Sequence, residues 1–427
     1  MLTKGKTSAI SLIVLLMTLA ASVLTACGDA SPTSTGASTQ STTTTAATTT
    51  GAATTASGTA TTAAAATGSA TGATTAASTG GNSSDGVFPG GLTGANLNAN
   101  LNGSGSTLVN PALKVWQTEF GKVAPNVKVN YPGGGSGQGR TDFLTDKTDF
   151  GASDVQITAD EATKTNKQLT DFIQIPVTLA GVVFTYNVPG VSELNFSPEV
   201  VGAIYTGKIT KWNDPKIKTD NPNVNLPDLN ISFAVRADSS GTSQVFTTYL
   251  AAINADLKTL FGASGATQPK WEGAGINVTT AQGNDGVAGL VKQTPGTLGY
   301  NEVAYAIQNN LNFANLKNKA GKFVKPTLEN LSAAAEGAKP DDNLKINLID
   351  QPGDNSYPIT TTSYIILSKN YTEKGKGEAV VAFVWYALHK GGTDAKSVNY
   401  APLPASLVSL AEAKLKLVTA EGAPILK

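Results

Sequence analysis

The stretch ISFAVRADSSGTSQVFTTYLAAIN (231–254) decides the fold of this chain. Its first part, ISFAVR (231–236), is a short run rich in apolar residues, which predicts a strand. A turn of small residues follows, and TSQVFTTYLAAIN (242–254) has the composition of a helix. A strand that leads through a short turn into a helix is typical of α/β proteins, so this stretch predicts that fold class.

The same alternation continues along the chain on both sides of this stretch. We expect strands at VKVNY (127–131), VTLAGVVFTYN (177–187) and YPITTTSYIILS (357–368), and helices at 108–123 and 377–390. No repeat of fixed period interrupts the pattern. With 427 residues the chain exceeds the usual domain size of about 100–150 residues, so two domains with additional segments are expected.

Composition excludes several classes of site. The chain has 31 basic and 31 acidic residues, which argues against a nucleic-acid partner held by broad electrostatic attraction. It has one cysteine, Cys27, and one histidine, His389, so a disulfide within the chain and a Cys/His metal site are excluded. His389 ends an apolar, helix-like stretch, where it fits a helix C-terminus better than the role of a catalytic base.

The N-terminal part has the features of an exported protein. Residues 1–26 combine early lysines with a long apolar run, which predicts a signal peptide. Its end, Leu24-Thr25-Ala26-Cys27, resembles the lipobox of bacterial lipoproteins, and the resemblance implies cleavage before Cys27 and lipid attachment to it. A plain signal peptide is the alternative. Residues 27–96 consist almost entirely of Ser, Thr, Ala and Gly, which predicts a disordered tether.

Three turns of small residues each precede a predicted helix. They are NGSGSTL (102–108), GGGSGQG (133–139) and DSSGT (238–242). A helix start exposes unpaired N–H groups, glycine lets an anion approach them, and Ser or Thr adds hydroxyl donors. One such turn is an ordinary cap, but three in one chain, with Arg236 beside the third, indicate a site for a phosphate-like oxyanion.

The second turn also has a misleading pattern. Gly134 to Thr141 reads G-x-x-x-x-G-R-T, which is close to a P-loop. Arg140 fills the position of the essential lysine, and no clear acidic strand for magnesium follows. A nucleotide hydrolase therefore ranks below an anion-binding protein.

At these turns the sequence resembles the periplasmic phosphate-binding proteins of high-affinity phosphate ABC transporters. The specific motifs are RADSSGTS (236–243) and DFGASD (149–154). Other matching segments follow in order from about residue 101 to the C-terminus, among them GSGSTLVNP (103–111), GNDGVAGLV (283–291) and YPITTTSYIIL (357–367).

The resemblance implies a set of ligand contacts. The first turn contributes the hydroxyl of Thr107 and the backbone N–H of Leu108, where the family often has phenylalanine. The second turn contributes Ser136, and the DFGASD motif contributes Asp154. The third turn contributes Arg236, Ser240, Gly241 through its N–H, and Thr242, with Asp238 holding the arginine.

Asp154 is the most informative member of this set. A carboxylate in an anion site is useful only if the ligand carries a proton, as phosphate does and sulfate at neutral pH does not. The residues by themselves leave simpler roles open. Asp154 and Asp238 could cap the helices that follow them, Arg236 could be a surface residue paired with Asp238, and the hydroxyl residues could be ordinary turn or cap residues.

The resemblance further implies a two-domain fold of the type II periplasmic-binding class, with two crossover strands near 175–186 and 357–367. Domain I would comprise residues 97–177 and 359–427, domain II residues 178–358, and the ligand would lie between them. Permease subunits of the transporter would be the protein partners, and we expect a monomer without cofactor or catalysis. The alternatives are a protein for phosphonate, sulfate or molybdate, a secreted phosphatase or nucleotide hydrolase, and an adhesive surface lipoprotein.

Overall fold

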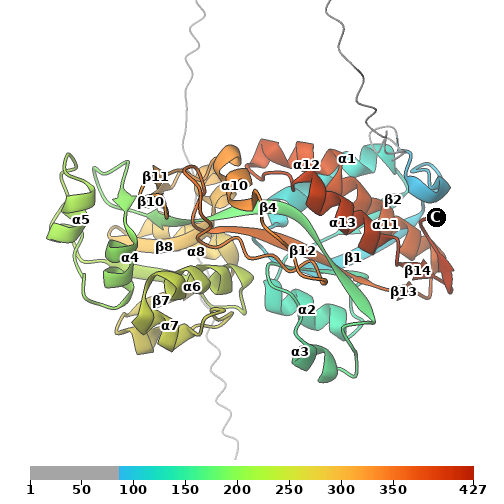
Figure 1. Cartoon of the computed structure of the whole chain (residues 1–427), viewed down its shortest axis with the longest axis horizontal. Coiled ribbons are helices and arrows are strands. Elements are labelled where there is room, and N and C mark those ends of the chain that lie inside the picture. Colours follow the sequence, from blue (N-terminus) through green and yellow to red (C-terminus); the bar gives the residue numbers. More distant parts are fainter. Residues whose placement is uncertain (1–85) are drawn as a thin grey trace, which may run out of the picture. The chain divides into compact units, whose positions relative to one another are not determined.

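The computed structural model describes residues 86–427, and these all fall within one compact unit. Strands and helices alternate along the chain and build a large mixed sheet with helices on its faces (Figure 1). The α/β fold class is therefore confirmed. Within residues 86–427, no helix has both the length and the apolar composition needed to cross a membrane.

The main sheet of the described residues contains nine strands. Its order is β2-β1-β3-β12-β4-β8-β6-β7, and β9 pairs with β4 in addition. The bounds are β1 Ala99–Gly105, β2 Val127–Asn130, β3 Phe150–Ser153, β4 Phe172–Tyr186, β6 Ser232–Arg236, β7 Val278–Ala281, β8 Thr297–Glu302, β9 Asn312–Phe313 and β12 Thr360–Ser368. Two parallel groups of strands, β2-β1-β3 and β8-β6-β7, lie on either side of the antiparallel strands β12 and β4.

The strand β4 belongs to both parts of the sheet. Its residues 172–181 pair with β12, and its residues 182–186 pair with β8. β4 begins at Phe172, five residues before the predicted start at 177. Residues 172–176 are almost as well buried as the rest of the strand. The strand β12 begins at Thr360 rather than 357, since the side chain of Tyr357 turns into the core and donates to the carbonyl of Val182.

Helices cover both faces of the first parallel group. Helix α11 contacts β1 and α1 contacts β2, while α2 lies against β1 and β3 (Figure 1). Helices α6 and α8 pack in the same way on the second group. The helix bounds are α1 Asn110–Val123, α2 Ser136–Leu144, α3 Ala159–Thr163, α4 Pro198–Tyr205, α5 Pro215–Asp220, α6 Gly241–Ile253, α7 Ala255–Phe261, α8 Gly283–Gln293, α9 Val303–Gln308, α10 Leu328–Ala335, α11 Lys374–Leu388, α12 Lys390–Asp394 and α13 Ala405–Leu415.

Short strands form two further small sheets among the described residues. One has the order β11-β10-β5, and the other has the order β13-β14-β15. Their bounds are β5 Asn195–Phe196, β10 Asn315–Lys317, β11 Phe323–Val324, β13 Asn370–Tyr371, β14 Thr419–Ala420 and β15 Ala423–Pro424.

Residues 86–96, which the composition assigned to the tether, pack onto the folded unit. Phe88 is buried, and its ring lies 6.0 Å from the ring of Phe120 in α1. The N–H of Gly94 donates to the carbonyl of Gly86, which closes this segment into a compact loop. The predicted boundary between tether and folded domain, at 96/97, therefore lies too late in the chain. One buried aromatic residue, Phe88, anchors a segment that is otherwise only weakly apolar. Residues 1–85, including Cys27, lie outside the described residues.

Candidate functional site

The three small-residue turns lie next to one another in the folded chain. The N–H of Gly137, at the start of α2, donates to the carbonyl of Ser239 in the β6–α6 turn at 2.8 Å. A Cβ atom on Gly241, at the start of α6, would lie 2.4 Å from Oγ of Ser136 and 2.6 Å from Oδ2 of Asp154. Only glycine therefore lets the first turn of α6 approach these two side chains so closely.

The second turn has a backbone that glycine makes accessible. Gly133, Gly134 and Gly135 have φ angles of 87°, 118° and 96°, which residues with a Cβ rarely adopt. Helix α2 then begins at Ser136, inside the predicted turn 133–139. The hydroxyl of Ser136 accepts from the backbone N–H of Asp154 at 3.2 Å, which joins this turn to the end of β3.

Asp154 is buried and surrounded by hydroxyl groups. Its Oδ1 accepts from Ser106 at 2.6 Å and from Ser363 at 2.5 Å, and its Oδ2 accepts from Ser136 at 3.1 Å. Burial raises the pKa of Asp154, while these three hydrogen bonds and the charge of Arg236 oppose that shift. The role of helix cap is wrong for Asp154, because Thr158 caps α3 in a capping box with Glu161.

Arg236 and Asp238 form a buried ion pair. Their side chains are 1% and 6% exposed, and the guanidinium donates through Nε and Nη2 to both carboxylate oxygens. Oδ1 of Asp238 also accepts from the N–H of Gly283 at 3.0 Å. Burial alone would raise the pKa of Asp238, but the arginine lowers it below its usual value. The surface-arginine interpretation is therefore wrong, and the cap of α6 is Ser240 rather than Asp238.

Two threonine hydroxyls accept hydrogen bonds and keep their own protons free. Oγ1 of Thr242 accepts from Nη1 of Arg236 at 3.2 Å and from Nδ2 of Asn284 at 3.4 Å. Oγ1 of Thr107 accepts from the backbone N–H of Asn284 at 3.2 Å and from its Nδ2 at 3.0 Å. A hydroxyl whose lone pairs are occupied in this way presents its O–H to a further acceptor.

Leu108 and Ser240 use part of their hydrogen-bonding capacity within the protein. The N–H of Leu108 donates to Oγ of Ser106 at 3.0 Å. The hydroxyl of Ser240 accepts from the N–H of Ser243 at 3.0 Å, which leaves its proton available. The structure thus brings Thr107, Ser136, Asp154, Arg236, Gly241 and Thr242 together, with Ser240 next to them as the cap of α6, and it turns the N–H of Leu108 toward Ser106.

Sequence reasoning missed three residues of this network: Ser106, Asn284 and Ser363. All three lie inside segments that carry the family resemblance. The resemblance therefore placed them in matching segments but indicated no role for them in the site. A serine in a turn or a strand has no distinctive sequence signal. Their contacts with Asp154 and with the two threonines arise only when β1, β12 and α8 meet.

Arg140 of the P-loop-like pattern and His389 both have structural roles in the folded chain. Arg140 pairs with Glu161 at 2.9 Å and donates to Ser153, so its guanidinium is held by the protein itself. His389 caps α11, as its position predicted, and its Nε2 lies 2.9 Å from Glu412. Among residues 86–427, no group of three or more His, Cys, Asp or Glu side chains could hold a metal ion.

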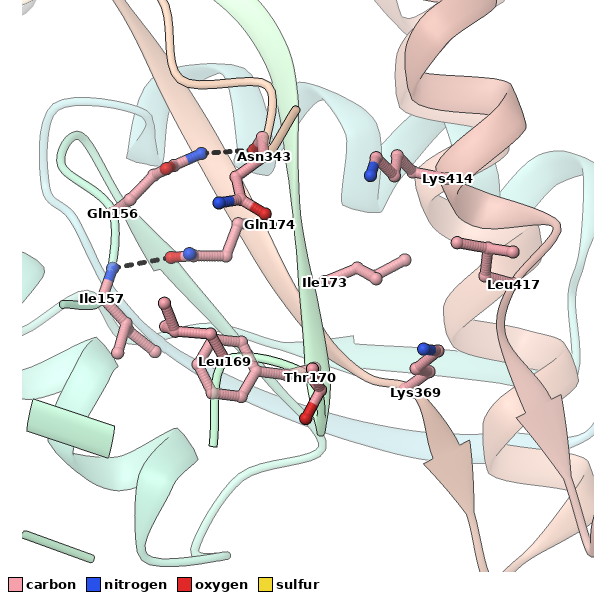
Figure 2. A pocket seen from close by; sticks show the side chains of 11 residues that line it. Gln156, Ile157, Leu169, Thr170, Ile173, Gln174, Asn343, Lys369, Lys414 and Leu417 are labelled. Carbon is pink, nitrogen blue, oxygen red and sulfur yellow. Dashed lines mark hydrogen bonds between the residues drawn. The ribbon is translucent and has the colours of Figure 1, made fainter. Parts of the chain in front are cut away.

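A separate cavity of about 210 Å³ lies near the start of β4 (Figure 2). Gln156 donates to the carbonyl of Asn343 there, and the N–H of Ile157 donates to the side chain of Gln174, both at 2.7 Å. None of the predicted site residues lines this cavity. This cavity is therefore separate from the hydrogen-bond network that the three turns form.

The chemistry of the network suits a tetrahedral anion that carries a proton. Hydroxyl protons, a guanidinium and the N-terminus of the 13-residue helix α6 are donors of hydrogen bonds or sources of positive potential. The Asp154 carboxylate is the acceptor among these donors, and its Oδ2 lies at the start of α6.

Comparison with known proteins assigns the family. A model described as PBP superfamily domain matches residues 33–388. The phosphate-binding protein PstS of Haemophilus influenzae is 36% identical over 321 residues, which are 74% of this chain and 92% of that protein. PstS of Methanocaldococcus jannaschii is 36% identical over 304 residues, which are 67% of this chain and 78% of that protein. This chain belongs to the PstS family.

The solved structures agree with a PstS fold. A phosphate-binding protein from Stenotrophomonas maltophilia covers 74% of this chain and 93% of its own, with a TM-score of 0.57 and 19% identity. A periplasmic phosphate-binding protein named PfluDING, solved with phosphate, has a TM-score of 0.58 and 21% identity over 74% of this chain and 93% of its own. The predicted type II periplasmic-binding fold of this PstS-family chain is thus confirmed.

Proposed function

We propose that this chain binds inorganic phosphate outside the cytoplasmic membrane and delivers it to a phosphate ABC transporter. The observation that carries the proposal is the position of Asp154, a buried carboxylate with Oδ2 at the N-terminus of α6, among hydroxyl donors and Arg236. The relatives named phosphate-binding protein PstS support the same ligand.

The carboxylate gives a reason for choosing phosphate over sulfate. Phosphate at neutral pH keeps a P–OH group, which can donate to Oδ2 of Asp154. Sulfate has no proton to share, so it would place an unshared negative charge beside a buried carboxylate. Like-charge contact and an unpaired buried group each cost free energy. Sulfate would bear both costs and phosphate would not, so the site favours phosphate.

The proposed contacts are the predicted ones, with two modifications. Thr107, Ser240 and Thr242 donate through their hydroxyls, Arg236 through its guanidinium, and Gly241 through its N–H. Ser136 gives its one hydroxyl proton to Oδ2 of Asp154 in this structure, so it would donate to phosphate only after releasing that bond. Asp238 holds the arginine. The N–H of Leu108 reaches phosphate only after releasing its bond to Ser106, so Leu108 contributes last.

We further propose that binding closes two domains on each other. Domain I would be residues 97–177 and 359–427, with residues 86–96 packed onto it through Phe88, and domain II residues 178–358. Hydrogen bonds between Thr107 and Asn284 and between Gly137 and Ser239 already join the two parallel strand groups through their turns. A phosphate held by both groups would stabilise this closed arrangement, which the permease subunits of the transporter would recognise.

The proposal includes the chain's location and its lack of catalysis. The lipobox at Cys27 would anchor the protein by lipid to the outer face of the cytoplasmic membrane or on its periplasmic side. The protein would act there as a monomer that binds without transforming its ligand, in keeping with its relatives named phosphate-binding protein.

Calorimetric titration of the purified protein with phosphate and then with sulfate tests this function. We expect phosphate to bind and sulfate not to bind at neutral pH, and Asp154→Asn to admit sulfate because an amide can donate to it. Tighter binding of phosphonate or molybdate would favour another oxyanion. Equal binding of phosphate and sulfate by the unmodified protein, or of neither, would contradict the proposal.

A further inference from the structure

The Asp154 carboxylate is held at one oxygen by the protein itself. Oδ1 accepts from the hydroxyls of Ser106 and Ser363, which come from the end of β1 and from the middle of β12. All three side chains are buried. A carboxylate offers about four acceptor positions, two on each oxygen. The two serines therefore occupy Oδ1 fully.

The other oxygen keeps one free position. Oδ2 accepts one hydrogen bond, from Ser136 at 3.1 Å. It faces the start of α6, where a Cβ on Gly241 would come within 2.6 Å of it. One lone pair on Oδ2 is thus left for a donor that arrives at the helix N-terminus.

We propose that Ser106 and Ser363 are positioning residues for specificity, which fix the Asp154 carboxylate so that Oδ2 alone accepts the hydrogen of the ligand. This inference rests on the proposed phosphate binding and assigns residues that the family motifs left without a role. Neither serine touches the ligand in this arrangement. Both act through Asp154.

The two serines also lower the pH at which the Asp154 carboxylate becomes charged. A hydrogen bond donated to a carboxylate stabilises its ionised form, so the serines oppose the rise in pKa that burial causes at Asp154. Arg236 lowers this pKa further, while Tyr131, Tyr400 and Glu302 are the other ionisable groups coupled to Asp154. The tyrosines have pKa values raised by burial and stay neutral.

The protonation state of Asp154 determines which anion the site accepts. An ionised Asp154 accepts from P–OH and repels sulfate. A protonated Asp154 becomes a donor, and a donor suits sulfate. Sulfate binding should therefore begin as the pH falls through the pKa of Asp154, and the two serines hold that pH low.

The test measures sulfate and phosphate affinity from about pH 5 to pH 8 for the unmodified protein, Ser363→Ala and Ser106→Ala. A hydrogen bond to a charged group contributes about 1.5–3 kcal/mol, which corresponds to about one to two pKa units. We expect the onset of sulfate binding to move upward by about one pH unit in each variant. Ser356→Ala is the matched control, because Ser356 is equally buried and its hydroxyl has no partner.

Carbon NMR of carboxyl-labelled aspartate gives a second measurement that does not depend on sulfate. We expect a higher pKa for Asp154 in both serine variants and no change in Ser356→Ala. An unchanged pKa and an unchanged sulfate onset, with or without weaker phosphate binding, would overturn the positioning role while leaving phosphate binding intact. Absence of phosphate binding by the unmodified protein would instead reject the proposed function.

Discussion

Nδ2 of Asn284 lies 3.0 Å from Oγ1 of Thr107, although the two residues are 177 positions apart in the chain. The N–H of Glu302 fixes the orientation of the Asn284 amide, because it donates to Oδ1 of Asn284 at 3.0 Å. The same Nδ2 reaches Oγ1 of Thr242 at 3.4 Å. Asn284 thus directs the protons of two threonines from different turns toward the proposed phosphate.

Replacing Asn284 should weaken phosphate binding through those threonines. Asn284→Ala removes the donor and should raise the phosphate Kd about tenfold, the effect of one hydrogen bond of about 1.4 kcal/mol. Asn284→Asp should weaken binding further, since a carboxylate would accept from the threonine hydroxyls and add a negative charge. Calorimetry measures both, with the exposed Asn347→Asp as control. An equal Kd for Asn284→Asp and the unmodified protein would contradict this role.

Gly241→Ala should interfere with closure of the site. The added Cβ would meet Ser136 and Asp154 at 2.4 and 2.6 Å, and overpacking of this kind costs about 1–3 kcal/mol. We expect the phosphate Kd to rise about tenfold or more in titration calorimetry. Gly289→Ala adds the same methyl group to α8, where a Cβ meets nothing within 4 Å, and should leave the Kd unchanged. Equal affinities of the two variants would count against a close approach at Gly241.

Removing the charge of Arg236 should destabilise the unliganded protein as well as abolish most phosphate binding. Arg236→Met leaves Asp238 buried without its partner, which costs about 3–5 kcal/mol of unfolding free energy. Because the folded-state pKa of Asp238 is lowered, its stabilising contribution is present above the unfolded-state pKa and lost as the pH falls through the folded-state pKa. The difference between variant and parent should therefore shrink only as the pH falls below the unfolded-state pKa of aspartate, about 3.9.

Urea denaturation at neutral and acid pH measures this difference. Lys208→Met is the control, because the pair of Lys208 with Asp256 has side chains that are 63% and 72% exposed and should contribute little. A destabilisation by Arg236→Met that grows on acidification would show that Asp238 is not the group left unpaired.

Glu302→Gln should change how stability depends on pH. Glu302 is fully buried, its Oε2 accepts from Tyr400 and from the N–H of Ala304, and its Oε1 has no partner. Burial raises its pKa well above the usual value. A raised folded-state pKa gives stability that is fully present below the unfolded-state pKa and is lost as the pH rises through the folded-state pKa.

The glutamine variant cannot ionise, so it should retain stability at higher pH where the parent loses it. Thermal unfolding from about pH 5 to pH 9 compares the two proteins. We expect similar Tm values at the acid end and a higher Tm for Glu302→Gln at the alkaline end. A parallel decline of both Tm curves would show that another group causes the pH dependence.

Much of the fold followed from local patterns. The strands near 127–131 and 231–236 and the helices near 108–123 and 242–254 were predicted to within about two residues, because their apolar spacing and turn residues agree. The segment around Phe88 was not, since its composition is that of a linker and one distant contact with Phe120 anchors it. Local composition cannot report a contact of this kind.

The sequence by itself determined the class of the fold, the three anion-compatible turns, and the pairing of Arg236 with an aspartate two positions away. These features depend on neighbours in the chain, and such neighbours are always close. Tertiary structure alone decided that Ser106 and Ser363 share one oxygen of Asp154 and that Asn284 directs Thr107. Those contacts join residues that are 48 to 209 positions apart in the chain, so their geometry exists only after the sheet has formed.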